Sequence, residues 1–258
     1  METEFSSAYR DLDQRMKALA ESDGDVYLPN PEPSGTVAYV FVCMEPSLGG
    51  WARSAEEARA KVDSGFRNFL AGIDPMLLHF AARRFLCAPG QRYHITDFSK
   101  GAMLVKHAGT ARNDRYEKWY ALLREEIDLI AAPGASVIAV GKVVADHLRR
   151  YRFDRRVTPV IHYSPLASPA RAARLQGHEE QFREFARSIS TEDILASARE
   201  VLAESKVPPE ISAGALSIVR RSRLSESQRK LIYCYKLAFD ALKNSRQGPT
   251  VGEGPGSF

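Results

Sequence analysis

The chain has only three cysteines among 258 residues, and Cys43, Cys87 and Cys234 lie far apart. This spacing offers neither a disulfide framework nor the paired ligands of a zinc or iron–sulfur site. We therefore expect no metal, no cofactor and a reducing, cytoplasmic compartment. The sequence also lacks an apolar run of the roughly 20 residues that a membrane helix needs. Its first residues mix acidic, basic and apolar side chains, which is not the pattern of a signal peptide.

A large excess of charge of either sign is absent as well. The formal net charge is +4, and the composition is 44% hydrophobic and 26% charged. These proportions are typical of a globular protein. The mild positive charge permits a polyanionic partner without requiring one.

Four short apolar segments are typical of buried strands, and segments with helical periodicity lie between them. The strand candidates are residues 37–42, 93–97, 136–141 and 157–161. Strands and helices that alternate at this spacing predict an α/β fold, with a central parallel four-stranded sheet flanked by helices.

The character of the chain changes near residue 190. No strand candidate follows, and helical segments at 192–205 and 225–243 are separated by two prolines. We therefore expect an α/β domain over 1–190 and a helical extension over 191–244. The extension is expected to bind DNA or a partner, or to be a packing helix with a solvated basic face, so a chain cut near residue 190 should keep some activity. Residues 245–258 are rich in glycine and proline and are expected to be disordered.

Three of the strand candidates end on or just before an ionisable residue. Glu45 follows the first, Asp97 closes the second and His162 follows the fourth. Open α/β sheets bind their ligands in a crevice at the carboxyl ends of the strands. Each residue alone could be a solvated loop residue, but together they predict a site at one edge of the sheet.

The segments around these residues resemble motifs of the uracil-DNA glycosylase superfamily. Residues 43–47 (CMEPS) resemble its first motif, and residues 162–168 (HYSPLAS) resemble its last. Residues 93–97 (YHITD) and 137–141 (VIAVG) resemble two strand motifs that the family carries between them. The resemblance covers residues 35–187 and implies a glycosylase fold.

The resemblance implies hydrolysis of the bond between a flipped base and its sugar. Glu45 matches the residue that orients or deprotonates the attacking water, and His162 matches the neutral histidine that donates to the 2-oxygen of the leaving pyrimidine. No lysine occupies a motif position where it could form a Schiff base, so a monofunctional enzyme is expected. DNA is the expected partner, and the protein is expected to be a monomer.

The sequence departs from the family pattern at Cys43, Tyr163 and Asp97, which replace a glycine, a proline and an asparagine. The change at Asp97 bears on the base. Asparagine can accept from N3–H of uracil and donate to its 4-oxygen, whereas an ionised aspartate only accepts. Asp97 would instead accept a hydrogen bond from a 4-amino group. If protonated, it would also donate a hydrogen bond to the bare N3 of cytosine.

The size of the base pocket is predicted from neighbouring residues. In strict uracil enzymes a tyrosine blocks the pyrimidine 5-position, and Ser47 in its place leaves room. A cytosine with a bulky 5-substituent, such as glucosylated hydroxymethylcytosine of phage DNA, is therefore the preferred substrate, which suggests an antiviral defence role. Phe66 is the candidate for stacking on the base, with Trp51 and Phe69 as competitors.

DNA contacts are expected from the last motif, the loop after it and one lysine. Hydroxyl and backbone groups of the motif would hold phosphates, arginines would pair with them, and a leucine would enter the duplex as a wedge. The residues are Ser164, Ser168, Arg171, Arg174, Leu175 and Lys100.

Three other functions stay open at this point. The protein could be a uracil-DNA glycosylase of base-excision repair. It could be a nucleic-acid-binding protein that keeps a glycosylase-like fold without catalysis, or a hydrolase of nucleotides or nucleosides. Formation of abasic sites in defined DNA separates these functions from the preferred one.

Overall fold

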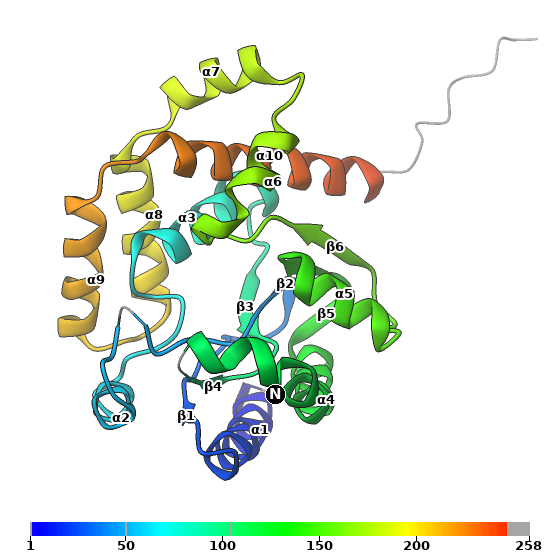
Figure 1. The fold of residues 1–258 in the computed structure, drawn as a ribbon, viewed down its shortest axis with the longest axis vertical. Helices are drawn as coiled ribbons and strands as arrows, with labels where there is room; N and C mark the ends of the chain where they lie inside the picture. Colours follow the sequence, from blue (N-terminus) through cyan, green and yellow to red (C-terminus); the bar gives the residue numbers. More distant parts are fainter. Residues whose placement is uncertain (1, 50, 104, 247–258) are drawn as a thin grey trace, which may run out of the picture.

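The computed structural model describes residues 2–49, 51–103 and 105–246, and a parallel sheet lies at its centre (Figure 1). The strand order is β3-β2-β5-β6. The strands are β2 (Val37–Cys43), β3 (Tyr93–Asp97), β5 (Ala131–Val140) and β6 (Val157–Val160). The predicted α/β class and the four-stranded parallel sheet are confirmed.

Strand β2 is buried on both faces because its side chains alternate between two apolar layers. Tyr39, Phe41 and Cys43 belong to one hydrophobic cluster, whereas Val40 and Val42 belong to another. This alternation follows from the period of two in a strand. A continuous apolar run is therefore what a central parallel strand requires.

Helices cover both faces of the sheet (Figure 1). One face packs against α1 (Glu2–Ser22), α4 (Val105–Ile130) and α5 (Lys142–Arg150). The other face packs against α3 (Ile73–Ala81), α8 (Thr191–Glu204), α9 (Pro209–Arg221) and α10 (Glu226–Arg246). Within the part of the chain that the structure describes, every helix is too short or too polar to cross a membrane.

A small antiparallel pair continues the fold beyond the end of β3. Its strands are β1 (Val26–Tyr27) and β4 (Gly101–Ala102), and the Leu28 N–H donates to the Lys100 carbonyl at 2.9 Å. The proline-rich segment after β1 then leads the chain back to the start of β2. The remaining elements are α2 (Ala55–Asp63), η1 (Ala82–Leu86), η2 (Pro165–Ala167), α6 (Ser168–Arg174) and α7 (Glu179–Ser188).

The sequence prediction missed α9. The two prolines at 208 and 209 were interpreted as a break, but Pro209 is the first residue of the helix. Proline is favoured there because its missing N–H would have had no partner within the helix. The predicted disorder falls mainly on residues 247–258, outside the described residues, while Ser245 lies within α10.

The helices after residue 190 share a core with the sheet. Phe239 of α10 meets Phe41 of β2 edge-to-face, with ring centroids 5.9 Å apart. Ile194 of α8 and Val219 of α9 lie in the same cluster of buried residues. The expected boundary near residue 190 therefore does not separate two cores. The expectation that a chain cut there keeps activity conflicts with this packing.

Phe239→Ala should lower the free energy of unfolding by about 3–5 kcal/mol, because it leaves a cavity against the buried face of β2. Ile218→Ala on α9 is the control, since Ile218 is 47% exposed and its loss should change stability little. Urea unfolding followed by circular dichroism measures both variants. Equal small effects would show that α10 is not part of the sheet's core.

Candidate active site

The carboxyl ends of the strands bring together the three ionisable residues that the sequence singled out. Asp97, the last residue of β3, pairs in register with Cys43, the last residue of β2, and Glu45 lies two residues further on. His162 lies two residues after the end of β6, and the charge of Glu45 influences its pKa. The predicted site at one edge of the sheet is thus consistent with the backbone topology.

Glu45 is held in one orientation by two residues of α4. Arg112 donates to Oε1 from Nε at 3.0 Å and from Nη2 at 2.6 Å, and the Tyr116 hydroxyl donates to Oε2 at 2.5 Å. The Glu45 side chain is only 3% exposed. Burial, and then the charge of Glu45, raise the pKa of Tyr116 well above its usual value, so its hydroxyl keeps its proton. Glu45 is therefore a fixed, paired carboxylate and not a solvated loop acid.

His162 is positioned as a neutral hydrogen-bond donor. The Ser164 N–H donates to Nδ1 at 3.0 Å, so the neutral ring carries its proton on Nε2. Burial lowers the pKa of His162 to about 4, although the charge of Glu45 opposes the shift. Gly141 makes room for the ring: its φ is +101°, and a Cβ there would lie 3.2 Å from Cβ of His162.

Asp97 is almost completely buried and receives two amide donors. Asn68 Nδ2 donates to its Oδ2 at 2.7 Å, and Asn30 Nδ2 donates to the same oxygen at 3.2 Å. Burial raises the pKa of Asp97 to about 8, and the hydrogen bonds from Asn68 and Asn30 and the charge of Lys100 only partly oppose it. Asp97 is thus mostly protonated at neutral pH.

Lys100 cannot serve as the predicted phosphate contact, because it is 1% exposed. Its Nζ lies 2.6 Å from Oε1 of Glu126 on α4, and Oε2 of that carboxylate accepts from the Thr96 hydroxyl at 2.8 Å. Burial alone would raise the pKa of Glu126, but Lys100 and His94 outweigh it and lower the pKa to about 2. The prediction for Lys100 was wrong because its ammonium group pairs with the buried carboxylate of Glu126, 26 residues later in the chain.

Two predicted DNA contacts in the segment after the last motif are also buried. Arg171 donates to the Ser164 carbonyl at 2.5 Å and to the Ser227 hydroxyl at 3.2 Å, so it supports the loop from inside. Leu175 packs in a cluster with Phe182. These positions contradict the predicted phosphate contact of Arg171 and the predicted wedge role of Leu175.

Other side chains of this loop face the solvent. Leu166 is 92% exposed, the highest value among the large apolar residues described as exposed. Ser168, the first residue of α6, and Arg174 near its end are exposed as well. Ser164 directs its backbone N–H to His162. The exposed apolar tip of the loop is thus Leu166.

The aromatic candidates divide into a stacked pair and a core residue. Phe66 stacks on Trp51, with ring centroids 4.9 Å apart, and the Trp51 indole N–H donates to the Ser47 carbonyl at 2.7 Å. Phe69 lies in the main hydrophobic cluster and is buried. Ser47, Trp51 and Phe66 therefore form one corner beside the end of β2, with one face of Phe66 covered by Trp51.

Sequence reasoning missed the residues that orient the carboxyl groups. Arg112 and Tyr116 are four residues apart, a spacing that places both on one side of a helix, so this signal was available. Asn30 and Asn68 lie in irregular segments without such a pattern.

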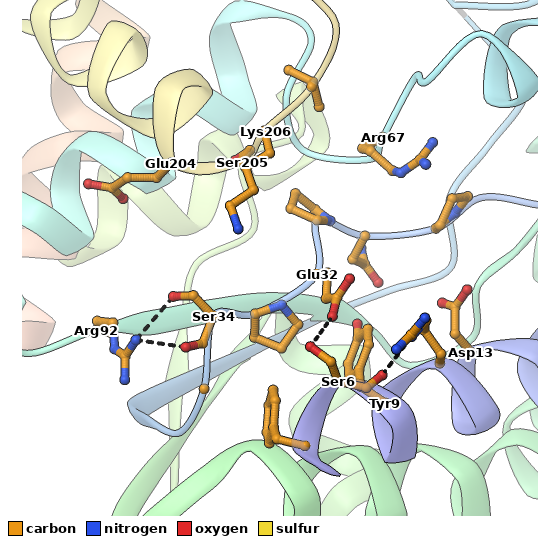
Figure 2. A pocket seen from close by; sticks show the side chains of 18 of the residues that line it. Ser6, Tyr9, Asp13, Glu32, Ser34, Arg67, Arg92, Glu204, Ser205 and Lys206 are labelled. Carbon is orange, nitrogen blue, oxygen red and sulfur yellow. Dashed lines mark hydrogen bonds between the residues drawn. The ribbon is translucent and has the colours of Figure 1, made fainter. Parts of the chain in front are cut away.

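Two of the cavities in the structure bear on where the site lies. One of about 730 Å³ is lined by His162 together with Lys142, Arg149, Arg174 and Asp146, and Asp146 pairs with both Lys142 and Arg149. A larger one of about 1080 Å³ lies between α1, residues 29–36 and the turn from α8 to α9 (Figure 2). The larger cavity carries charges of both signs and none of the predicted site residues, so its size does not make it the site.

Within residues 2–49, 51–103 and 105–246, no group of three or more histidine, cysteine or acidic side chains could hold a metal ion. Comparisons with protein-family models, with curated proteins and with solved structures find no match. The residues themselves therefore carry the functional argument.

Lys100→Met should destabilise the protein by about 3–5 kcal/mol, because it leaves Glu126 as an unpaired buried charge. Lys142→Met is the matched control: Lys142 pairs with Asp146 on the surface, and such pairs contribute at most about 1 kcal/mol. Denaturant unfolding at neutral pH gives both values. A stable Lys100→Met variant that binds DNA less tightly would restore the phosphate role.

Proposed function

We propose that the protein is a monofunctional DNA glycosylase, with a fold like that of the uracil-DNA glycosylases, which hydrolyses the N-glycosidic bond of a flipped pyrimidine. One observation carries the proposal: a fixed carboxylate, Glu45, and a neutral histidine, His162, both lie where strands of the parallel sheet reach their carboxyl ends. Cleavage needs an anion beneath the sugar and a donor at the departing base.

Glu45 supplies the negative charge. As the bond breaks, the sugar acquires oxocarbenium character, and a buried carboxylate nearby stabilises that charge. Glu45 also accepts a hydrogen bond from the attacking water and takes its proton as the new C–O bond completes. Arg112 and Tyr116 keep the carboxylate in place, so little reorganisation accompanies the reaction.

His162 supplies the donor for the leaving group. The electron pair of the broken C–N bond passes to the base, and negative charge appears on its 2-oxygen. The Nε2–H of neutral His162 donates to that oxygen, since Nδ1 is already engaged by Ser164. Burial lowers the pKa of His162 to about 4, so the ring is neutral at neutral pH.

Asp97 favours a 4-amino pyrimidine over uracil. A neutral carboxyl group donates its proton to the bare N3 of cytosine, whereas N3 of uracil carries a hydrogen of its own. The pKa of about 8 keeps this proton in place at neutral pH. With the small Ser47 beside the 5-position, the proposed substrate is a 5-modified cytosine such as that of phage DNA, and the proposed role is defence.

Features around the site suit a DNA partner. Leu166 is the exposed apolar tip that could enter a duplex, and the cavity next to His162 carries the exposed Arg174. Apolar wedges beside cations that contact phosphates are common in proteins that extrude a base.

The proposal is tested by scoring the formation of abasic sites in a panel of DNA substrates. The panel consists of duplexes and single strands that carry uracil, a thymine mismatch, cytosine, 5-hydroxymethylcytosine or its glucosylated forms. We expect cleavage of a modified cytosine. Cleavage of uracil alone would identify a repair enzyme. Binding without cleavage would identify a non-catalytic protein, and cleavage of free nucleosides a nucleoside hydrolase.

Glu45→Gln should reduce single-turnover cleavage by about 10²-fold or more while DNA binding stays near normal, because the lost charge acts mainly in the transition state. Glu57→Gln, at the start of α2, is the control that removes an acid elsewhere. Cleavage by Glu45→Gln at the wild-type rate would remove Glu45 from the mechanism.

Asp97→Asn should shift the preference between bases towards uracil by roughly 10²- to 10⁴-fold, because the amide presents a donor to the 4-oxygen and an acceptor to N3–H.

Wild-type cleavage of the modified cytosine should fall as pH rises through about 8, where Asp97 loses its proton. The variant should lack this decline. Rates on both bases from pH 6 to pH 10 provide the measurement, and a uniform loss on both would contradict base reading by Asp97.

A further inference from the structure

The side-chain amide of Asn68 has a fixed orientation. Its Oδ1 accepts from the Phe69 N–H at 2.9 Å, and its Nδ2 donates to Asp97 Oδ2 at 2.7 Å. Phe69 has φ of +62°, a conformation that only a few per cent of residues other than glycine adopt. Turning the amide over would place its oxygen against Oδ2 of Asp97 and its NH₂ group against the Phe69 N–H. The NH₂ group of Asn68 therefore faces Asp97.

This orientation distinguishes the two oxygens of Asp97. In a neutral carboxyl group one oxygen is a carbonyl, which accepts hydrogen bonds well, and the other carries the proton. A short N–H···O contact from Asn68 makes Oδ2 the carbonyl oxygen. Asn30 Nδ2 approaches the same oxygen at 3.2 Å. The proton of neutral Asp97 consequently lies on Oδ1.

The other ionisable groups near Asp97 do not compete for this proton. Lys100 and Glu126 neutralise one another in a buried pair. Burial, and then the charges of neighbouring groups that include Asp97, raise the pKa of the Cys43 thiol and the Tyr163 phenol well above their usual values, so both stay neutral. The side-chain amides of Asn68 and Asn30 therefore determine which oxygen of Asp97 carries the proton.

We propose that Asn68 is a specificity-determining positioning residue: by donating to Oδ2 of Asp97, it places the carboxyl proton on Oδ1, where it can be given to an unprotonated ring nitrogen. The inference rests on the proposed base-excision function for its effect on specificity. Its effect on Asp97 itself holds whatever base is bound. Asn68 acts through Asp97 and touches no reacting atom.

Asn68→Asp is the sharpest variant because it keeps the shape of the side chain and the acceptor for the Phe69 N–H. It replaces the donor towards Asp97 by an oxygen, so the two carboxyl groups share a proton at Oδ2 and Oδ1 becomes an acceptor. The ratio of cleavage of modified cytosine to cleavage of uracil should fall by about 10-fold or more. Asn244→Asp, the same change at an exposed position of α10, should leave the ratio unchanged.

A second measurement needs no activity. The carboxyl carbon of Asp97 is followed by ¹³C NMR across pH 5 to 10 and assigned by its absence from Asp97→Asn. The wild-type signal should titrate near pH 8. In Asn68→Ala it should titrate at higher pH, because the lost donor stabilises the carboxylate.

The two measurements separate failure of the inference from failure of the proposed function. If the wild type cleaves a base but Asn68→Asp keeps the wild-type ratio, the specificity role of Asn68 is overturned while the glycosylase function stands. If no base is cleaved, the proposed function fails and the specificity role with it. The titration in Asn68→Ala then decides alone whether Asn68 controls the proton, and an unchanged midpoint overturns that part too.

Discussion

The buried ion pair between Lys100 and Glu126 is the interaction on which the site depends. Lys100 follows β3 by three residues, and Glu126 lies on α4, so the pair fixes α4 against the end of β3. The same helix carries Arg112 and Tyr116, which hold Glu45. Loss of one charge would leave the other unpaired in the interior, at a cost of about 3–5 kcal/mol. The orientation of Glu45 is thus coupled to a contact within the core.

Two buried carboxyl groups in this region have opposite protonation states because their neighbours differ. Glu126 lies 2.6 Å from an ammonium group and has a pKa of about 2, whereas Asp97 meets two neutral amides and has a pKa of about 8. An amide hydrogen bond offsets only part of the cost of burying a charge, while a cation in contact offsets more. Environments that push the pKa values of two acids apart in this way leave one ionised and the other protonated at the same pH.

The sequence predicted the carboxyl ends of the strands to within one residue, because apolar runs and the residues that stop them are local features. Strand β5 begins five residues earlier than predicted, at Ala131. Glu45, Asp97 and His162 follow from that pattern alone. Side-chain partners could not be predicted in the same way. Lysine and arginine side chains usually lie on the surface. The burial of Lys100 and Arg171 depends on their partners Glu126 and Ser227, which are distant in sequence. Charged side chains are seldom fully buried unless they are paired, so exposure was the natural expectation.

The helices after residue 190 support the edge of the sheet that carries the proposed site as well as the core. Ser227 lies at the start of α10 and accepts from Arg171, and Arg171 donates in turn to the carbonyl of Ser164. The Ser164 N–H fixes the tautomer of His162. A continuous series of hydrogen bonds therefore runs from the C-terminal helix to the proposed leaving-group donor. Because α10 also covers one face of the sheet through Phe239, the segment without a counterpart in the glycosylase motifs helps to define the geometry of the site.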